Sequence, residues 1–423
     1  MAKTKQVKNQ YNQSEDSLYD VAVVGGGMVG ATVALGLAKG GFKVALIEKS
    51  RPSLEWQSSD SFETRVSALT RASENILKSL GAWPGILSKR YHAFTDMHVW
   101  EDISNAQVHF AAKDIEESNL GFVVENKVIQ IALWEQLLEQ QNVTILTDGL
   151  LASIQVAVQP GGISSTYLEF DNGNTIQASL VVGADGAFSK VRQMSGIGLE
   201  SHDYEQCAVV GCVETELSHQ NTCWQRYREE GPFAYLCMNG NISSIAWYMP
   251  VEKMDWAMSL DDKAFAEEVE KASGGCLGRV ISVNKRDAFP LTRRHALEYV
   301  KPGIALVGDA AHTIHPQAGQ GVNLGLLDAA ALIETLVNAK QENAVSWSRF
   351  SVLRRYERWR KGDNQIVQRS MEGFDWLFEQ DNNAKNAVRK ALLPMANRMQ
   401  AAKNWLMSQA LKGRHALPEL ARD

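Results

Sequence analysis

Three glycine-punctuated segments, far apart in the chain, carry residue types that could bind the phosphates and hydroxyls of one nucleotide. They are Val23–Gly30, Val181–Arg192 and Ala305–Gly325. Glycine lets a backbone turn tightly and lets an anion approach backbone N–H groups. Any one segment could arise by coincidence, but the three in this order indicate a single dinucleotide site.

The first segment has the spacing of a phosphate-binding turn between a strand and a helix. Gly25, Gly27 and Gly30 occupy the glycine positions of G-x-G-x-x-G, which serve the tight turn, the approach of a pyrophosphate and close helix–strand packing. The apolar run Tyr19–Val24 predicts the strand. Met28–Lys39 predicts a helix whose N-terminal N–H groups and dipole favour an anion.

A carboxylate follows the next predicted strand of the same unit. That strand is Phe42–Ile47, after a helix stop at Gly40-Gly41, and Glu48 at its end can accept hydrogen bonds from ribose hydroxyls. The alternative is that Val21–Ala38 spans a membrane, which its glycines and its strand–turn–helix punctuation oppose.

The chain between the segments alternates predicted helices and strands, which indicates a dinucleotide domain interrupted by a sheet-based domain. The strongest hairpin signal is Asp171-Asn172-Gly173-Asn174 between two apolar runs. Helices are predicted at Glu63–Leu80, Lys127–Gln141, Asp261–Ala272 and over most of the chain after Gly319. Strands are predicted at Met97–Trp100, Val108–Phe110, Leu151–Val158, Tyr167–Phe170, Thr175–Ala178, Leu180–Val182, Cys207–Thr215, Thr222–Tyr227, Phe233–Met238 and Ile242–Met249.

Composition indicates a soluble enzyme with more than one domain. The 423 residues exceed one ordinary core, and 45% hydrophobic and 22% charged residues are typical of a globular protein. A formal net charge of -6 gives no field for nucleic acid. The 5 cysteines include no C-x-x-C pair, which favours a reducing compartment over a disulfide framework or a zinc site. The cytoplasm is therefore the expected location.

With these residues in view, the chain resembles the class A flavoprotein aromatic hydroxylases, the family of p-hydroxybenzoate hydroxylase. Within it the chain is most similar to the ubiquinone-biosynthesis hydroxylases, and among these to the bacterial enzymes of the late demethoxyubiquinol step. The resemblance covers roughly Asp20–Arg360, and Glu63 stands where the family usually has Asp. Besides the three segments, it rests on Glu63–Leu69 (ETRVSAL), Leu120–Asn126 (LGFVVEN), Ala288–Leu297 (AFPLTRRHAL) and Gly308–Pro316 (GDAAHTIHP).

The resemblance implies an α/β fold with a Rossmann-like FAD-binding domain, an inserted β-sheet substrate domain and a helical C-terminal region. The FAD-binding domain would comprise residues 19–90, 113–205 and 291–365. The substrate domain would comprise residues 91–112 and 206–290, and the C-terminal region residues 366–423. Residues 1–18 are polar and are expected to form a disordered lead-in.

The resemblance also implies where FAD is held. Asp185 would lie near the pyrophosphate and the path of NAD(P)H, and Asp309 on a ribityl hydroxyl. The alternative for the second segment, taken alone, is an Asp-Gly turn after a buried strand. Pro316 would lie against the flavin ring. The expected FAD contacts are Gly25, Gly27, Met28, Val29, Gly30, Glu48, Lys49, Arg65, Asn126, Gln130, Asp185, Gly186, Gly308, Asp309, Pro316, Gly319, Gln320, Gly321, Val322 and Asn323.

Some of these assignments have equally simple alternatives. Arg65, placed near the start of a predicted helix, could be a phosphate or ribityl contact or a solvated arginine. His315 could line the flavin ring with Pro316, although structural roles are preferred for it and for His312. No side chain is assigned as catalytic, and no set of histidines with a carboxylate at usable spacing predicts a metal.

The reaction implied by the resemblance is ring hydroxylation in ubiquinone biosynthesis. NAD(P)H reduces FAD, O₂ forms a C4a-hydroperoxide, and a polyprenylated benzoquinol or phenol is hydroxylated. The aromatic residues of the predicted substrate domain could line a pocket for such a ring, or they could belong to the hydrophobic core. They are Trp224, Tyr227, Phe233, Tyr235, Trp247 and Tyr248. The rival functions are an FAD-dependent reductase or dehydrogenase of the same fold, such as a prenyl-chain reductase, and a non-enzymatic FAD-binding module.

A cluster of basic residues near the end of the chain is compatible with several kinds of binding partner. Its members are Arg354, Arg355, Arg358, Arg360 and Lys361, and a helical tail follows at Lys385–Lys412. They could form a peripheral contact with the inner membrane, a contact with other ubiquinone-biosynthesis proteins, a homo-oligomer interface, or simply a solvated helix.

Overall fold

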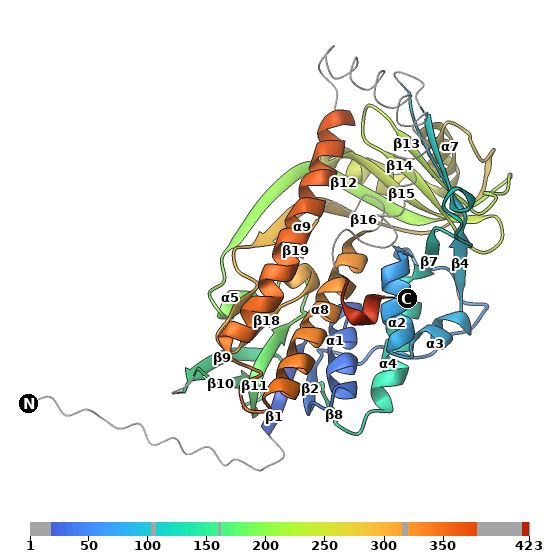
Figure 1. Cartoon of the computed structure of the whole chain (residues 1–423). Coiled ribbons are helices and arrows are strands. Elements are labelled where there is room, and N and C mark those ends of the chain that lie inside the picture. The colour runs from blue at the N-terminus through green and yellow to red at the C-terminus, as the bar shows by residue number, and fades with distance from the viewer. Residues whose placement is uncertain (1–17, 103–106, 160–161, 315–319, 379–416, 423) are drawn as a thin grey trace, which may run out of the picture.

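The computed structural model describes residues 18–102, 107–159, 162–314, 320–378 and 417–422. Two large sheets lie at opposite ends of the molecule, and the helices α8 (Gln320–Glu342) and α9 (Phe350–Phe378) run beside the first (Figure 1). A small three-stranded sheet, ordered β3-β7-β4, consists of β3 (Val66–Leu69), β7 (Gly121–Glu125) and β4 (Tyr91–Phe94).

The first sheet has a parallel core in the order β18-β11-β1-β2-β8. These strands are β18 (Ile304–Leu306), β11 (Thr175–Gly183), β1 (Leu18–Val24), β2 (Val44–Ile47) and β8 (Val143–Leu146). The sheet is completed by β17 (Val300–Lys301), β10 (Ser164–Phe170) and β9 (Leu151–Val158). The strands β1, β11 and β18 are adjacent, and each leads into one of the three glycine segments. Because parallel strands end at the same edge, the three segments meet there.

The helices beside this sheet explain its burial. In α1 (Met28–Lys39) every residue from Gly30 to Ala38 is buried. This helix packs against α8 on one side and against α4 (Asn126–Leu138) on the other. Such a helix is apolar all round because neighbours cover most of its surface.

The second sheet is mostly antiparallel, in the order β19-β16-β12-β15-β14-β13-β5-β6. Its strands are β19 (His312–Thr313), β16 (Val280–Ala296), β12 (Leu199–Thr215), β15 (Ile242–Pro250), β14 (Phe233–Cys237), β13 (Thr222–Tyr227), β5 (Asp96–Glu101) and β6 (Gln107–Ala111). One face packs under α6 (Met254–Ser259) and α7 (Asp262–Ser273) around Phe233, Tyr235 and Trp247. Those three aromatic residues are therefore core.

The remaining elements are short. They are α2 (Arg71–Ser79), α3 (Trp83–Leu87), α5 (Lys190–Met194) and the 3₁₀ turns η2 (Ala112–Ile115), η3 (Val251–Lys253), η4 (Gly308–Ala310) and η6 (Glu419–Ala421). The turn η6 contacts α2 and α8, so the last described residues pack against these two helices.

Most predicted elements are confirmed, and one helix is wrong in its first half. The hairpin at Asp171–Asn174 joins β10 to β11, and Met28–Lys39 is helical as predicted. The first half of the predicted helix Glu63–Leu80 instead contains the strand β3, in which Val66 pairs with Glu125 of β7. The helix α2 starts only after Thr70, whose side chain accepts a hydrogen bond from Ser73 N.

The predicted division into domains stays a prediction. Strands β5 and β6 join the second sheet with β12–β16, whereas β4, from the same predicted segment, pairs with β7. The tail Lys385–Lys412 and most of the lead-in 1–18 lie outside the described residues.

The segment Val21–Ala38, considered as a membrane span, forms β1 and α1 in the core. Of the described helices, Gly321–Glu342 has the length and composition to cross a membrane, with a mean hydropathy of 1.3 over its most apolar window, of which 67% is buried. It packs between α1 and α9, which is how the core helix of a folded domain behaves.

Candidate functional site

The three glycine segments touch one another at the edge of the first sheet. A Cβ atom at Gly25 would lie 2.4 Å from the Ala184 carbonyl oxygen, so the first segment packs directly on the second. A Cβ atom at Gly308 would lie 3.3 Å from both Cγ atoms of Val29, so the first segment also packs on the third. Side chains at Gly25 or Gly308 would push the segments apart. The expectation that the three segments come together is confirmed, whereas the dinucleotide that they would share stays a prediction.

The first segment leaves a space where a pyrophosphate could lie. Gly25 has φ +103°, and a Cβ atom at Gly30 would lie 1.9 Å from the Gly25 carbonyl oxygen, so both positions need glycine for the turn itself. A Cβ atom at Gly27 would meet no atom within 4 Å. Gly27 is therefore not required by packing, and the open space above it lies at the N-terminus of α1.

Three side chains hold the peptide of Gly26 in the middle of this turn. Glu48 Oε2 accepts a hydrogen bond from Gly26 N at 2.5 Å. The Gly26 carbonyl oxygen accepts bonds from Gln130 Nε2 at 3.0 Å and from Trp134 Nε1 at 2.8 Å. Glu48 and Gln130 were expected near the dinucleotide, whereas Trp134 was missed. Its place at mid-helix on α4, in an apolar run, gave no signal beyond core packing.

A cavity of about 390 Å³ opens beside Gly27. Arg65 lies at its wall directly before β3, and its guanidinium carbon lies 4.7 Å from the centre of the Phe289 ring on β16. Asn126 is fixed by Ser67 Oγ, which donates to Asn126 Oδ1 at 2.6 Å. The lining residues are Gly27, Met28, Glu63, Thr64, Arg65, Asn126, Lys127, Gln130 and Asp287. The cavity thus joins the first segment to the second sheet.

In the second segment, Asp185 is only partly satisfied. Its Oδ2 accepts hydrogen bonds from Lys190 N at 2.6 Å and Val191 N at 3.1 Å. Its Oδ1 is buried and has no hydrogen-bond partner among the described residues. An unpaired buried carboxylate oxygen is costly, so this atom is suited to accept a hydrogen bond from a bound ligand. Gly186 has φ +79°, and a Cβ atom there would meet nothing within 4 Å.

Arg192 ties the second segment to the third. The side chain is 3% exposed, and its Nη1 donates to the Ala310 carbonyl oxygen at 2.8 Å. Its Nη2 donates to the Ala187 carbonyl oxygen at 2.9 Å. Arg192 therefore positions backbone in both segments.

In the third segment, Asp309 is accessible to solvent although protein surrounds it closely. Desolvation raises the pKa of its carboxyl group, while the charges of His312, Arg65 and Arg294 act to lower it. A carboxylate that is accessible to solvent and is also desolvated by its neighbours is suited to accept a hydrogen bond from a ribityl hydroxyl. The residues Gly308–Ala310 form η4, directly after β18.

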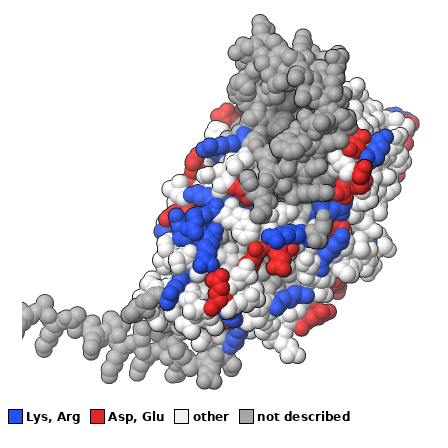
Figure 2. Space-filling view, in the orientation of Figure 1, with Lys and Arg blue, Asp and Glu red and all other residues white. Residues whose placement is uncertain are grey.

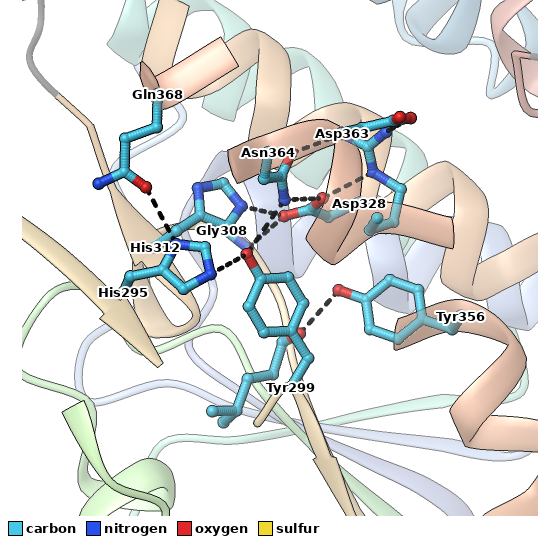
Figure 3. A network of polar contacts seen from close by, with 11 residues as sticks. His295, Tyr299, Gly308, His312, Asp328, Tyr356, Asp363, Asn364 and Gln368 are labelled. Atoms are coloured by element: carbon cyan, nitrogen blue, oxygen red, sulfur yellow. Dashed lines mark hydrogen bonds and ion pairs between the residues drawn. The ribbon is translucent and has the colours of Figure 1, made fainter. Parts of the chain in front are cut away.

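A buried polar network supports this segment from behind (Figure 3). Asp328 of α8 is fully buried, and its Oδ2 accepts hydrogen bonds from Gly308 N and His312 Nε2. Its Oδ1 accepts bonds from Arg360 Nε at 2.8 Å and Asn364 Nδ2 at 3.0 Å, both from α9. Burial alone would raise the pKa of Asp328, but His312, Arg360 and the hydrogen bonds outweigh it and lower the pKa to about 2. The preferred structural role of His312 agrees with this contact.

The network continues to β16 through neutral groups. Tyr299 OH lies 3.4 Å from His295 Nε2, and His295 Nδ1 lies 3.1 Å from Gln368 Oε1 (Figure 3). Burial, and then the charge of His312, lower the pKa of His295 to about 4. Arg360, which the sequence placed in a basic surface cluster, is instead 3% exposed and paired with Asp328, so that part of the prediction is wrong.

Three expected contacts, His315, Pro316 and Gly319, lie outside the described residues. The helix α8 begins at Gln320, as expected, and a Cβ atom at Gly321 would meet nothing within 4 Å. Val322 is half-buried against the first-sheet core. The Asn323 side chain is used internally: its Oδ1 accepts from Ser73 Oγ at 2.6 Å and its Nδ2 donates to the Ala68 carbonyl oxygen at 2.8 Å. Only the Asn323 backbone could serve a ligand.

One cluster of potential metal ligands occurs among the described residues. His92, His219 and Cys237 have ligand atoms within 4.8 Å of one another. Both ring nitrogens of His219 are already engaged, Nε2 by the Met238 carbonyl oxygen at 2.8 Å and Nδ1 by Asn221 N at 3.1 Å. The cluster therefore gives no reason to assign a metal.

These observations fit an extended dinucleotide. Open space above Gly27 and Gly186, the buried Oδ1 of Asp185 and the solvent-accessible carboxylate of Asp309 lie along one sheet edge. The chain matches the family model described as FAD binding domain over residues 18–370, and it belongs to this family. By class it is an FAD-dependent monooxygenase with a dinucleotide site of this type.

Two relatives and one solved structure show which members of this class the chain is similar to. The chain is 39% identical to the 3-demethoxyubiquinol 3-hydroxylase of Escherichia coli K12, over 93% of this chain and 98% of that protein. It is 32% identical to the human mitochondrial ubiquinone biosynthesis monooxygenase COQ6, covering 94% of each chain. The crystal structure of p-nitrophenol 4-monooxygenase PnpA from Pseudomonas putida shares the fold, with a TM-score of 0.75 at 19% identity, covering 95% of this chain and 100% of that one.

Proposed function

We propose that this protein hydroxylates the aromatic ring of a polyprenylated benzoquinol or phenol in ubiquinone biosynthesis, with FAD, NAD(P)H and O₂. The observation that carries the proposal is the 39% identity over nearly the whole length of a relative named for hydroxylation of demethoxyubiquinol, together with a site shaped for FAD. FAD, when bound and reduced, supplies the chemistry that activates O₂. The protein has to hold the ring, exclude water and fix the dinucleotide.

The face of the second sheet nearest the FAD side is suited to an apolar ring. It carries Ala208, Tyr248 and Leu291 as a buried cluster. Tyr204, Val210, Ala246 and Phe289 pack against that cluster. Because the Phe289 ring contacts Arg65 at the cavity wall, this face borders the dinucleotide site. A ring bound between this wall and the flavin would be shielded from water, which hydroxylation needs if reduced flavin is not to lose its electrons to peroxide.

The roles that we propose for the FAD contacts follow from their geometry. Gly27 would leave room for the pyrophosphate at the α1 N-terminus, and Glu48, beside Gly26, would face the adenosine ribose. Asp185 Oδ1 would accept a hydrogen bond from a ligand hydroxyl or a bound water, and Asp309 would accept one from the ribityl chain. Pro316, His315 and the backbone at the start of α8 would line the ring.

An FAD-dependent reductase of the same fold is the second candidate. It would share every FAD contact and would not consume O₂. Product analysis separates the two: a monooxygenase consumes O₂ in step with a product one oxygen atom heavier, whereas a reductase gives a product two hydrogens heavier without O₂.

The test of substrate class is a genetic complementation read by mass spectrometry. A bacterial strain lacking its demethoxyubiquinol hydroxylase should accumulate the demethoxy intermediate, and this chain should restore ubiquinone. The Gly27→Val variant, expressed to the same level, should not. Restoration of ubiquinone by Gly27→Val would contradict the proposal, and accumulation of a different intermediate with the wild-type chain would reassign the ring position.

We also propose a cytoplasmic location with peripheral contact to the inner membrane or to other ubiquinone-biosynthesis proteins. Lys and Arg side chains follow α9 in Figure 2, and Arg355, Arg358 and Arg369 share its exposed side. A cationic helix face supports contact with an anionic surface. Co-sedimentation with vesicles of anionic lipid, lost in an Arg355→Gln/Arg358→Gln variant, is expected; equal sedimentation of both proteins would contradict this contact. Self-association is testable by analytical ultracentrifugation.

A further inference from the structure

We propose that β9 (Leu151–Val158) is a homodimer interface, at which two copies of this chain join their first sheets by antiparallel pairing of their β9 strands. The inference goes beyond the proposed function and does not depend on the reaction. The strand β9 lies at the margin of the molecule (Figure 1). It pairs with β10, and no strand among the described residues pairs with its other edge.

The edge of the first sheet at β9 is long. The strand has 8 residues. The other strands that end a sheet in the described parts of the chain are β17, β8, β19, β6, β3 and β4, and they have 2, 4, 2, 5, 4 and 4 residues. Natural proteins keep exposed edges short, because a row of unpaired N–H and C=O groups is a template for another strand. Of these edges, β9 is therefore the best suited to add a strand.

The strand also lacks the side chains that normally prevent edge pairing. Its sequence, LASIQVAV, contains no charged residue and no proline. Val156 and Val158 are 39% and 56% exposed. Although α5 contacts β9, all four residues of Gln155–Val158 remain exposed. Exposed aliphatic side chains along an open edge would be buried by an added strand, which favours its binding.

The strand is complementary to itself, which is why we assign a second copy as the partner. In an antiparallel pair related by a two-fold axis, residues at equal distances from the axis lie opposite each other on the same face. An axis at Val156 places this residue opposite the partner's Val156, and Ile154 opposite the partner's Val158. On the other face, Gln155 lies opposite the partner's Ala157. These aliphatic cross-strand pairs stabilise a sheet, and a neutral strand brings no like charges together.

Strand pairing alone makes a small interface. A standard stable interface buries about 1,600 Å² in total, and two paired strands of this length bury less. We therefore expect a reversible dimer with a dissociation constant on the order of micromolar or weaker. Its fraction should rise with protein concentration.

Sedimentation velocity of the FAD-loaded full chain over a range of concentrations tests the interface. The wild type should shift from monomer to dimer as the concentration rises. Val156→Lys and Val156→Glu each place two like charges opposite each other at the axis, so each should weaken the dimer by about tenfold or more. An equal mixture of the two variants should dimerise again, because lysine then faces glutamate.

A second variant and a control guard against effects on folding. Ala157→Lys places a lysine on the other face of the same edge and should also weaken the dimer. Val345→Lys makes the same change as Val156→Lys at a 69% exposed valine between α8 and α9, and it should dimerise like the wild type. FAD occupancy and the unfolding temperature should match the wild type in every variant that is compared.

The contrary results are specific. A wild-type chain that stays monomeric at every concentration would overturn the proposal. A dimer that Val156→Lys and Ala157→Lys leave unchanged would place the interface elsewhere and would also overturn it. Failure of the Val156→Lys and Val156→Glu mixture to dimerise, with both proteins folded, would overturn the two-fold pairing at Val156.

Discussion

Asp328→Asn tests the buried network behind the third segment. The wild-type carboxylate and the Arg360 guanidinium are 0% and 4% exposed and 2.8 Å apart. Removing the Asp328 charge leaves the buried Arg360 guanidinium with the more exposed Asp363 as its described ionic partner, which costs about 3–5 kcal/mol. Asparagine keeps the shape, so no cavity adds to the loss. Gly308 N also loses an ionised acceptor, so FAD should be held more weakly.

The assay is thermal and urea unfolding of the FAD-free and FAD-loaded proteins in a double-mutant cycle. The double variant Asp328→Asn/Arg360→Gln removes both charges. It should unfold at a higher temperature and a higher urea concentration than Asp328→Asn alone. The matched control is Asp363→Asn, because Asp363 contacts the same guanidinium at 3.2 Å but is 24% exposed, and it should cost no more than about 1 kcal/mol. An Asp328→Asn protein as stable as Asp363→Asn would refute the reasoning.

Gly27→Val should fold yet lose FAD, because a Cβ there meets no protein atom within 4 Å but enters the proposed pyrophosphate space; a fully yellow purified variant would contradict this. Asp309→Ala should weaken FAD binding roughly tenfold to hundredfold in a titration, and an unchanged affinity would place Asp309 outside the site. Burial lowers the pKa of His295 from 6.5 in the unfolded chain to about 4 in the folded protein. On acidification the unfolded state therefore binds this proton at a higher pH than the folded state does. Folding stability should therefore decrease by roughly 3 kcal/mol as the pH falls through that window. His295→Gln should remove this dependence, and an unaltered pH profile of unfolding would count against it.

Local sequence predicted the parts of the fold that depend on local chemistry. The glycine spacing placed β1, α1 and Glu48 because the turn between β1 and α1 requires glycine at Gly25 and Gly30, which is a local requirement. The hairpin at Asp171–Asn174 was equally readable, since turn residues fix the pairing of the strands beside them.

The strand β3 was not predictable in this way. Val66–Leu69 is followed by a helical pattern, and a strand of this length is stabilised by its distant partner β7 rather than by its own propensity. Arg65 was therefore predicted near the start of a helix, whereas it lies directly before β3. A capping signal was present at Thr70, whose side chain caps α2, and it marks the true start of the helix.

The buried network was also missed, although one signal for it exists. Asp328 is the lone carboxylate within the apolar stretch Leu324–Ile333, and a charge on the buried face of a helix requires a buried partner. No sequence pattern indicates that this partner is Arg360 on the next helix. Arg360 was therefore predicted to be exposed, like the basic residues beside it.

The central claim is that FAD-dependent activation of O₂ supplies the oxygen atom of the new ring hydroxyl. The most direct measurement is turnover of a polyprenylated benzoquinol substrate under ¹⁸O₂, with a parallel reaction in H₂¹⁸O, each with and without a metal chelator. We expect ¹⁸O in the product from ¹⁸O₂ only, with activity unaffected by the chelator. Label from water, or activity lost on chelation and restored by iron, would contradict it.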